Sequence, residues 1–458
     1  MAIELAGLAV ANVAYLVVGI AAFAAGGWVS PDRPATWRRL GAAYLFGMVA
    51  VVVPASYLAL FGLPVGLGAA LAGVAIVALA VRRVGLARRF ARPRLRWPTV
   101  EQLAALAVTG VGLVVVGYSF RAFVVRPLVD FDAWAIWAAK ARLLYQDAGA
   151  APGALRTGQY GQSPYPLGLP TIQALGFGAM GRFDGTLIGV QFAALALGFV
   201  GALWSLLERR ARPLGIALAA AAVVAAPELV YQLLTHYADV PLGFFVGLGV
   251  AAAAAWTVLP DDGWLLACAA AFLGMGALTK SEGTMFAAAA AVALLAAQSG
   301  PGWRERTRPA LVAVGAIVAI LLPWQIYCAA YHLKTSDYNL SDAASISYLR
   351  HHSDRLGPIL RELWRQLVDS HHWGYLVLTI AAGILAGAIG RRWRATAFTV
   401  VWLTLAFAGL VLIYWISTLP TSSNLTNSSF RTIVSLLVGG TAIVPLLIAP
   451  TQPKDPAP

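Results

Sequence analysis

Charged side chains are rare in this chain, yet the segment 129–146, VDFDAWAIWAAKARLLYQ, holds two aspartates, a lysine and an arginine. Asp130 and Asp132 stand two residues apart, and paired carboxylates are ligands that Mg²⁺ or Mn²⁺ accepts. A carboxylate that is partly removed from water also accepts a proton more readily, which suits a general base. As a helix, the segment places Asp132 and Lys140 on one face and its tryptophans on the other. It is either a catalytic or cation-binding helix or a juxtamembrane helix with solvated charges.

Three further polar motifs lie between apolar runs: THYADVP, LTKSEG and NSSFRT. The second and third contain Lys280 and Arg431, which could hold a phosphate group through charge-assisted hydrogen bonds. THYADVP contains His236 and Asp239, and LTKSEG also contains Glu282, and these three are predicted to bind substrate as well. Each motif has a structural alternative. The aspartate can cap a helix, the lysine can form a salt bridge within its turn, and the arginine can reach the lipid head groups.

The composition indicates which class of protein must position these residues. Of the 458 residues, 60% are hydrophobic and only 12% are charged, and the mean hydropathy is +0.74. Apolar runs of roughly 20 residues recur, each long enough to cross the ~30 Å hydrocarbon core of a bilayer as a helix. Lipid offers no hydrogen bonds to the backbone, so such runs must be helical. We expect an all-α polytopic integral membrane protein.

The apolar runs predict about 13 transmembrane helices in a single transmembrane domain, residues 1–458. The predicted spans are 5–27, 40–61, 64–81, 100–119, 186–207, 214–233, 241–259, 264–279, 284–298, 310–330, 374–390, 395–417 and 432–450. The segment 163–181, SPYPLGLPTIQALGFGAMG, is short and interrupted by proline and glycine.

The distribution of arginine and lysine predicts the orientation. If 163–181 does not span, the short basic stretches RPATWRR, RRVGLARRFARPRLR, ERRARP, WRERTR and RRWR all face the cytoplasm, as the positive-inside rule requires. The two long loops, 120–185 and 331–373, are then extracytoplasmic. Asp132 and the three other polar motifs lie on the same side, so a site is expected there.

Several partners are disfavoured. The net charge of +13 arises from arginines in short loops, which favours anionic membrane lipids over nucleic acid as the partner. Cys268 and Cys328 lie in apolar segments and predict neither a disulfide nor a thiolate metal site. The histidines of 331–373 lack a carboxylate at a compact spacing, so no metal site is expected in that loop.

The order of the motifs resembles that of the GT-C-type membrane glycosyltransferases, in the bacterial branch related to protein mannosyltransferases and lipid A glycosyltransferases. The elements in order are DFDAW..W..KA.LLY, YPLGLP, HYADVPL, LTKSEG and SSFR. The resemblance covers residues 110–300 best and Arg431 more loosely. YPLGLP lacks the second proline of the family's YPP-like element, and the four predicted spans before the first large loop are three more than the family usually has. A sizeable soluble C-terminal domain is also absent from the sequence.

The resemblance implies transfer of a sugar from a polyprenyl-phosphate donor to a lipid, glycan or protein acceptor outside a bacterial inner membrane. It implies that Asp132 is the general base, with Asp130 as second candidate. Tyr165 matches the YPP-like element, and Asp239 matches an acidic position at a later outer turn. Lys280 and Arg431 look like the family's basic residues near the lipid phosphate.

The residues themselves agree with that expectation but leave alternatives open. The predicted topology places Lys140, Lys280 and Arg431 at the outer face, where they could bind a phosphate, and a divalent cation is optional. A transporter or flippase for a lipid-linked sugar could use the same groups. That class places ionisable residues deep in the membrane, where only Glu228 lies well inside a predicted span. A membrane scaffold without catalytic activity is the third possibility.

Overall fold

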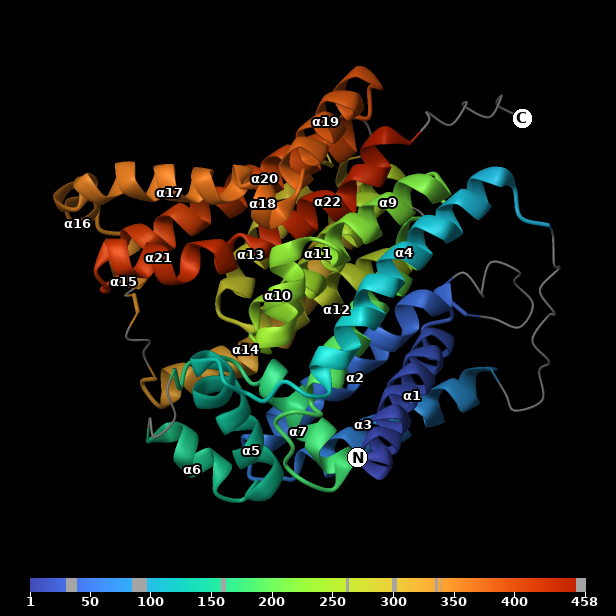
Figure 1. Cartoon of the computed structure of the whole chain (residues 1–458), viewed down its shortest axis with the longest axis vertical. Coiled ribbons are helices and arrows are strands. Elements are labelled where there is room, and N and C mark those ends of the chain that lie inside the picture. The colour runs from blue at the N-terminus through green and yellow to red at the C-terminus, as the bar shows by residue number, and fades with distance from the viewer. Residues whose placement is uncertain are drawn as a thin grey trace.

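The computed structural model describes residues 1–29, 39–84, 97–157, 162–260, 263–298, 303–333, 337–338 and 340–449. Every regular element within these ranges is a helix, apart from one isolated bridge between Tyr338 and Ser417. The all-α prediction is therefore confirmed for the described part of the chain (Figure 1). Much of the basic stretches at 29–39, 82–96 and 299–309 lies outside the described residues.

Nine helices in the described ranges are long and apolar enough to cross a membrane. They are α1 (Ala2–Ala25), α2 (Leu40–Ala59), α3 (Val65–Val84), α4 (Val100–Phe123), α8 (Gly189–Leu207), α11 (Asp239–Val258), α14 (Trp303–Ala330), α20 (Trp393–Trp415) and the continuous span Thr421–Ile448, formed by α21 (Thr421–Thr432) and α22 (Val434–Ile448). These helices have the length and composition of a multi-pass membrane protein.

The remaining predicted spans coincide with shorter or broken helices. The segment 214–233 is split into α9 (Pro213–Val224) and α10 (Pro227–Thr235), which meet at an angle of 55°. Proline at the first position of α10 explains the break, because proline cannot continue a preceding helix. Three apolar helices are shorter than 18 residues: α12 (Gly263–Thr279), α13 (Glu282–Ala296) and α19 (Leu376–Ile389). Each predicted segment thus contains helix, and the number of thirteen spans stays a prediction.

Helix α11 forms the centre of the bundle. Its apolar window is completely buried, and it packs against α8, α12 and α22 (Figure 1). Small residues allow this close packing. Gly243 and Gly247, one turn apart on α11, lie against Val434 and Val438 of α22. The first residue of α11 is Asp239, so the most buried of the nine candidate spans in the described ranges carries a carboxylate at its end.

The predicted outer loop 120–185 is largely helical where the structure describes it, as the helix expected at 129–146 suggested. It contains a π-helical turn η2 (Ala133–Ala138), α5 (Ala139–Gln146), α6 (Ala151–Arg156) and α7 (Gly168–Met180). Helix α7 has 13 residues, about 20 Å of helix, and is too short to cross the hydrocarbon core. Gly168 lies against the backbone of Leu278, where a Cβ would stand 2.4 Å from the carbonyl oxygen. This contact brings the preceding segment next to the end of α12.

The second predicted outer loop, 331–373, is also helical where it is described. It contains α15 (Leu340–Ala343), α16 (Ile346–His351), the 3₁₀ turn η3 (Ser353–Arg355), α17 (Leu356–Val368) and α18 (Ser370–Trp373). Helix α17 is amphipathic and packs beside α20 and α21 (Figure 1). The two loops therefore contribute helices to the same end of the bundle as the first residue of α11.

Candidate functional site

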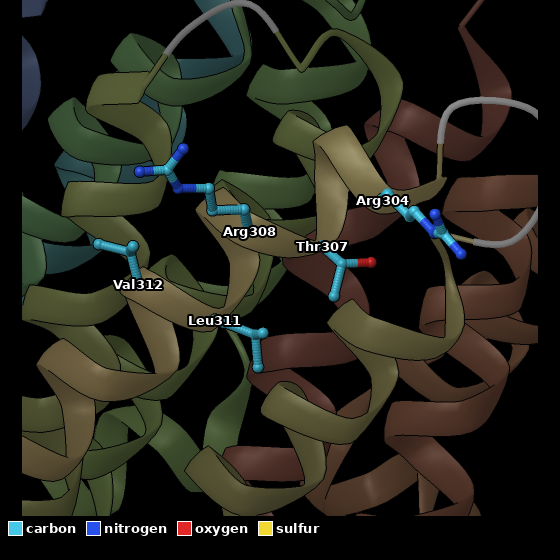
Figure 2. Close-up of a pocket in the computed structure, with 5 residues that line it drawn as sticks. All are labelled: Arg304, Thr307, Arg308, Leu311 and Val312. Atoms are coloured by element: carbon cyan, nitrogen blue, oxygen red, sulfur yellow. The ribbon is translucent and has the colours of Figure 1, made fainter.

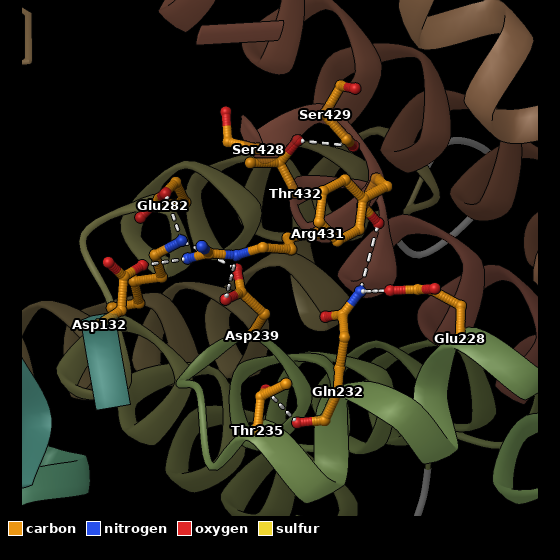
Figure 3. Close-up of polar contacts among 12 residues, drawn as sticks. Asp132, Glu228, Gln232, Thr235, Asp239, Glu282, Ser428, Ser429, Arg431 and Thr432 are labelled. Atoms are coloured by element: carbon orange, nitrogen blue, oxygen red, sulfur yellow. Dashed lines mark hydrogen bonds and ion pairs between the residues drawn. The ribbon is translucent and has the colours of Figure 1, made fainter. Parts of the chain in front are cut away.

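Five of the sequence-predicted residues form one continuous chain of ion pairs. Arg431 donates from Nη2 to Asp132 Oδ2 at 2.6 Å and from Nε to Asp239 Oδ2 at 3.3 Å. Lys280 Nζ donates to Asp239 Oδ1 at 2.8 Å and contacts Glu282 Oε1 at 2.9 Å. Figure 3 shows the guanidinium of Arg431 between the two aspartates. We call Asp132, Arg431, Asp239, Lys280 and Glu282 the ion-pair chain.

Four separate parts of the fold bring these side chains together. Asp132 immediately precedes η2, and Asp239 opens α11. Lys280 lies in the short turn between α12 and α13, where Glu282 begins the second of these helices. Arg431 lies in the last turn of α21. Helix ends converge here, and residues up to 299 positions apart in sequence become direct neighbours.

The environment of the ion-pair chain changes from enclosed to open along its length. Asp239 is 2% exposed and Lys280 5%. The side chain of Arg431 is 13% exposed, and that of Asp132 reaches 26%. A buried ion pair is strongly destabilising when one partner is removed, because a bare charge then remains in an apolar medium. Asp239 and Lys280 are therefore tied to each other, whereas Asp132 lies at the accessible end.

The charges of the ion-pair chain do not balance, because three carboxylates share two cations. Burial alone would lower the pKa of Lys280, but the carboxylates of Asp239 and Glu282 outweigh it and hold this pKa well above its ordinary value. Glu282 Oε2 is buried without a hydrogen-bond partner. A buried carboxylate oxygen without a partner is costly.

For Asp239, the sequence left open a purely structural role, in which its carboxylate caps the helix that it begins. In the structure, the start of α11 has no side-chain cap, and the Asp239 carboxylate instead accepts from Lys280 and Arg431. The alternatives for the other motifs hold in part. Lys280 and Glu282 do form the salt bridge of their turn, but Lys280 also reaches α11. Arg431 forms ion pairs with the carboxylates of Asp132 and Asp239.

Aromatic side chains lie near this chain of charges, and of these only Tyr165 is a predicted site residue. The Tyr237 ring lies under the Arg431 guanidinium at 4.2 Å, an arrangement that favours the cation. Tyr165 stacks on Trp137, with ring centroids 5.4 Å apart and planes at 4°. Burial raises the pKa of Tyr165, and the nearby Glu282 carboxylate adds to this effect. Burial and Glu282 likewise raise the pKa of Tyr338 to about 12. Both phenols stay protonated and can act as donors.

Lys140 does not join the ion-pair chain. Its fully buried ammonium donates to the backbone carbonyls of Gln162 at 2.6 Å, Tyr165 at 3.0 Å and Ser163 at 3.4 Å. Those carbonyls belong to the segment that carries Tyr165, so Lys140 fastens this segment to α5. Lys140 was predicted to bind a phosphate. In the structure its acceptors are instead the backbone carbonyls of a short segment that folds back over the helix.

Asp130 also lies apart from Asp132. Its carboxylate accepts from Arg126 Nη2 at 3.0 Å, while Asp132 pairs with Arg431. The two members of the D-x-D motif are thus held by arginines from different elements. Among the described residues, no three histidine, cysteine or acidic side chains gather as a metal site. A divalent cation between Asp130 and Asp132 stays a prediction.

His236 is predicted to bind substrate, but its imidazole is enclosed between the rings of Phe123 and Phe192. It ends α10 in the left-handed conformation, with φ of 60°. Neither ring nitrogen has a hydrogen-bond partner. Burial and the charge of Arg126 lower the pKa of His236 to about 4, so the ring is neutral near pH 7. His236 packs beside the site and does not contact the ion-pair chain.

One face of α14 lines a separate pocket of about 420 Å³ (Figure 2). Its lining residues are Arg304, Thr307, Arg308, Leu311 and Val312. No member of the ion-pair chain borders this pocket. Its arginines lie near the predicted cytoplasmic end of α14, opposite to the predicted side of the ion-pair chain. It is not the candidate functional site.

The fold and this site define a helical, multi-pass membrane protein with a buried ionic cluster where several helix ends meet. Comparisons with known proteins find no matching family model, no matching curated protein and no matching solved structure.

Proposed function

We propose that the protein is a GT-C-type glycosyltransferase of a bacterial cytoplasmic membrane, acting on its extracytoplasmic face. It transfers a sugar from a polyprenyl-phosphate donor to a lipid, glycan or protein acceptor. The observation that carries the proposal is the meeting of Asp132, the predicted base, with Lys280 and Arg431, the predicted phosphate ligands, in one ionic cluster. A sugar phosphate and an acceptor hydroxyl need these two kinds of group side by side.

The ion-pair chain supports an order of events. Asp239 contacts both Arg431 and Lys280, whereas Asp132 forms its ion pair, within the described residues, with Arg431 alone. A donor phosphate that binds Arg431 competes with Asp132 for the guanidinium. Asp239 then keeps Lys280 as its partner, and Asp132 is released. Donor binding thus frees the carboxylate that the acceptor needs.

The chemical step follows from this release. Asp132 takes the proton of the acceptor hydroxyl, and the acceptor oxygen attacks the anomeric carbon of the sugar. The bond between that carbon and the phosphate oxygen breaks, and the electron pair of this bond stays on the phosphate oxygen. The leaving phosphate remains bound to the Arg431 guanidinium. The products are the glycoside, the polyprenyl phosphate and protonated Asp132. Lys280 stabilises Asp239 next to the leaving phosphate, and a Mg²⁺ or Mn²⁺ ion is an optional addition at Asp132.

The test uses a radiolabelled polyprenyl-phosphate sugar and a membrane-lipid extract as acceptor, with purified protein in lipid. We expect Asp132→Asn to lower turnover by about 10²- to 10⁴-fold, the usual contribution of a general base. Asp147→Asn, in the same outer loop, is the matched control and should retain turnover. Turnover that survives Asp132→Asn at saturating donor and acceptor would refute the role of Asp132. Collapse in Asp130→Asn alone would transfer the role to Asp130.

One observation favours a second candidate, a transporter or flippase of a lipid-linked sugar. The break between α9 and α10 places Glu228 in the first turn of a half-helix, and transporters often build binding sites at such breaks. Glu228 accepts from Gln232, which also donates to the carbonyl of Phe430, next to Arg431 (Figure 3). Movement of a fluorescent lipid-linked sugar across liposomes without any sugar transfer would favour this function.

A further inference from the structure

Hydroxyl-bearing residues flank Arg431 on α21, and neighbouring helices hold them in place. Tyr414, in the last turn of α20, is 3% exposed. Its hydroxyl forms hydrogen bonds with the hydroxyl of Ser428 at 2.9 Å and with that of Thr432 at 3.0 Å. A phenol has one hydrogen and two acceptor lone pairs, so it can satisfy both partners. Figure 3 shows Ser428, Ser429 and Thr432 on the same stretch of helix as Arg431. One side chain of α20 thus bridges two positions that lie a helical turn apart on either side of Arg431.

A second contact reaches the same turn of α21 from α17. The buried Ser429 hydroxyl donates to Glu362 Oε1 at 3.3 Å. Arg365 Nη2 donates to the same oxygen at 2.7 Å, and the hydrogen bonds from Arg365 lower the pKa of the Glu362 carboxyl to about 2. Glu362 is therefore an ionised acceptor near pH 7, and hydrogen bonds to charged groups are stronger than those between neutral groups. Two helices thus hold the turn in which Arg431 lies.

Helix geometry separates these contacts from the Arg431 side chain. Successive residues of a helix are about 100° apart around its axis, so the three hydroxyl-bearing residues share an arc of about 100°. Arg431 points about 60° beyond the edge of this arc, toward Asp239 at the start of α11. Its guanidinium lies at the end of a long side chain, so a small rotation of α21 moves the guanidinium further than it moves the backbone. The contacts from α20 and α17 therefore determine where the guanidinium lies.

We propose that Tyr414 is a positioning residue for Arg431. Its hydroxyl fixes the rotation of α21 so that the guanidinium stands between Asp132 and Asp239, where it can exchange Asp132 for the donor phosphate. The inference rests on the proposed function for the identity of the group that Arg431 binds. It gives a role to α20, which supplies no member of the ion-pair chain.

Tyr414→Phe tests the proposal, because it removes the hydroxyl and keeps the ring. With the radiolabelled donor and the lipid acceptor, we expect the KM for the donor to rise about tenfold while the KM for the acceptor stays unchanged. A misplacement of about 1 Å can cost up to about 100-fold. A merely structural role would lower only the fraction of active protein, which reduces kcat and leaves both KM values unchanged. Thr432→Val removes one of the two hydrogen bonds and should raise the donor KM by less.

Tyr327→Phe is the matched control for this substitution. Tyr327 is 8% exposed, and its hydroxyl donates to the carbonyl of Pro152 in α6 at 3.1 Å. The control removes the hydrogen bond of another buried tyrosine and should leave both KM values unchanged. An unchanged donor KM in Tyr414→Phe, or an equal rise in Tyr327→Phe, would overturn the proposal.

A second measurement needs no turnover. Unfolding of the wild type, Tyr414→Phe, Arg431→Gln and the double variant in mixed lipid–detergent micelles gives the coupling between the two side chains. If Tyr414 acts through the ion pairs of Arg431, Tyr414→Phe should destabilise less once Arg431 has been replaced. Additive effects would overturn the proposal. Coupling in a wild-type protein that transfers no sugar would refute the proposed function and leave the positioning role in place.

Discussion

Two buried lysines, Lys140 and Lys280, have opposite surroundings and teach different lessons. Lys280 contacts the carboxylates of Asp239 and Glu282, which hold its pKa above the ordinary value. Lys140 contacts three backbone carbonyls, and burial lowers its pKa to about 7. The neutral carbonyl dipoles around Lys140 hold a segment of chain in place. The carboxylates around Lys280 form an ionic cluster whose ion pairs a charged ligand can exchange. The two residues had been assigned the same role.

The largest effect is expected on enzymatic activity, from the substitution Arg431→Gln. Arg431→Gln removes the cation that joins Asp132 to Asp239 and that we propose binds the donor phosphate. Loss of a charged hydrogen-bonding partner for a phosphate costs several kcal/mol, so kcat/KM for the sugar donor should fall by at least about 100-fold. Lys140→Met should retain more turnover than Arg431→Gln in the same assay. The reverse order would mean that Lys140, not Arg431, serves the substrate.

A smaller effect is expected on stability from Lys280→Met. This change leaves Asp239 with Arg431 only and Glu282 without its partner, and breaking a buried ion pair costs about 3–5 kcal/mol. Unfolding in mixed lipid–detergent micelles measures the loss. Adding Asp239→Asn should restore part of the stability, because the bare charge disappears. An additive double variant would show that the two side chains are not coupled.

Lys140→Met should destabilise by less. The change removes the hydrogen-bond donor of three backbone carbonyls. A buried polar group left without a partner lowers the free energy of unfolding by about 1–3 kcal/mol. The same unfolding assay applies, with hydrogen exchange of the segment around Tyr165 as a local readout. Faster exchange should be confined to this segment. A loss equal to that of Lys280→Met would contradict the distinction between dipole and charge partners.

The two lysines should also differ in pH dependence. The folded-state pKa of Lys140, about 7, lies below its unfolded value of about 10.4, so the unfolded chain binds more protons between these values. The unfolding free energy should therefore rise with pH across this window, by up to about 1.4 kcal/mol per unit. Lys140→Met should remove the rise. The folded-state pKa of Lys280 is raised, so its contribution to the unfolding free energy is lost only at a pH above the ordinary pKa of lysine. Identical pH profiles for Lys140→Met and the wild type would contradict this assignment.

The smallest effect is expected at Asp130. Its ion pair with Arg126 is partly exposed, with side-chain exposures of 20% and 27%, and such pairs contribute about 0–1 kcal/mol. Asp130→Asn should therefore change the unfolding midpoint little, whereas Lys280→Met should lower it clearly in the same assay. A loss of several kcal/mol would indicate that the Arg126–Asp130 pair is coupled to the ion-pair chain.

Much of the fold could be predicted because apolar length and charge are local properties of a sequence. Each predicted span contains helix, and the helix breaks at Pro227 and at the YPL segment coincide with proline. The split of the predicted span 214–233 was missed, although Pro227 was a visible signal. Of the candidate site residues, Asp132, Asp239, Lys280, Glu282 and Arg431 converge. Tyr237 was missed, although it lies within the THYADVP motif.

The sequence by itself determined that this protein is built from long apolar helices with the composition of a multi-pass membrane protein. The side of the membrane on which its polar residues lie stays a prediction. Hydrophobic length alone selects lipid-spanning helices, because an unpaired backbone group in lipid is too costly. Only the tertiary structure decided which cation meets which carboxylate, and that Lys140 and His236 lie outside the cluster. Those partners are up to 299 positions apart, and their meeting depends on how helix ends pack around α11. No local pattern encodes that geometry.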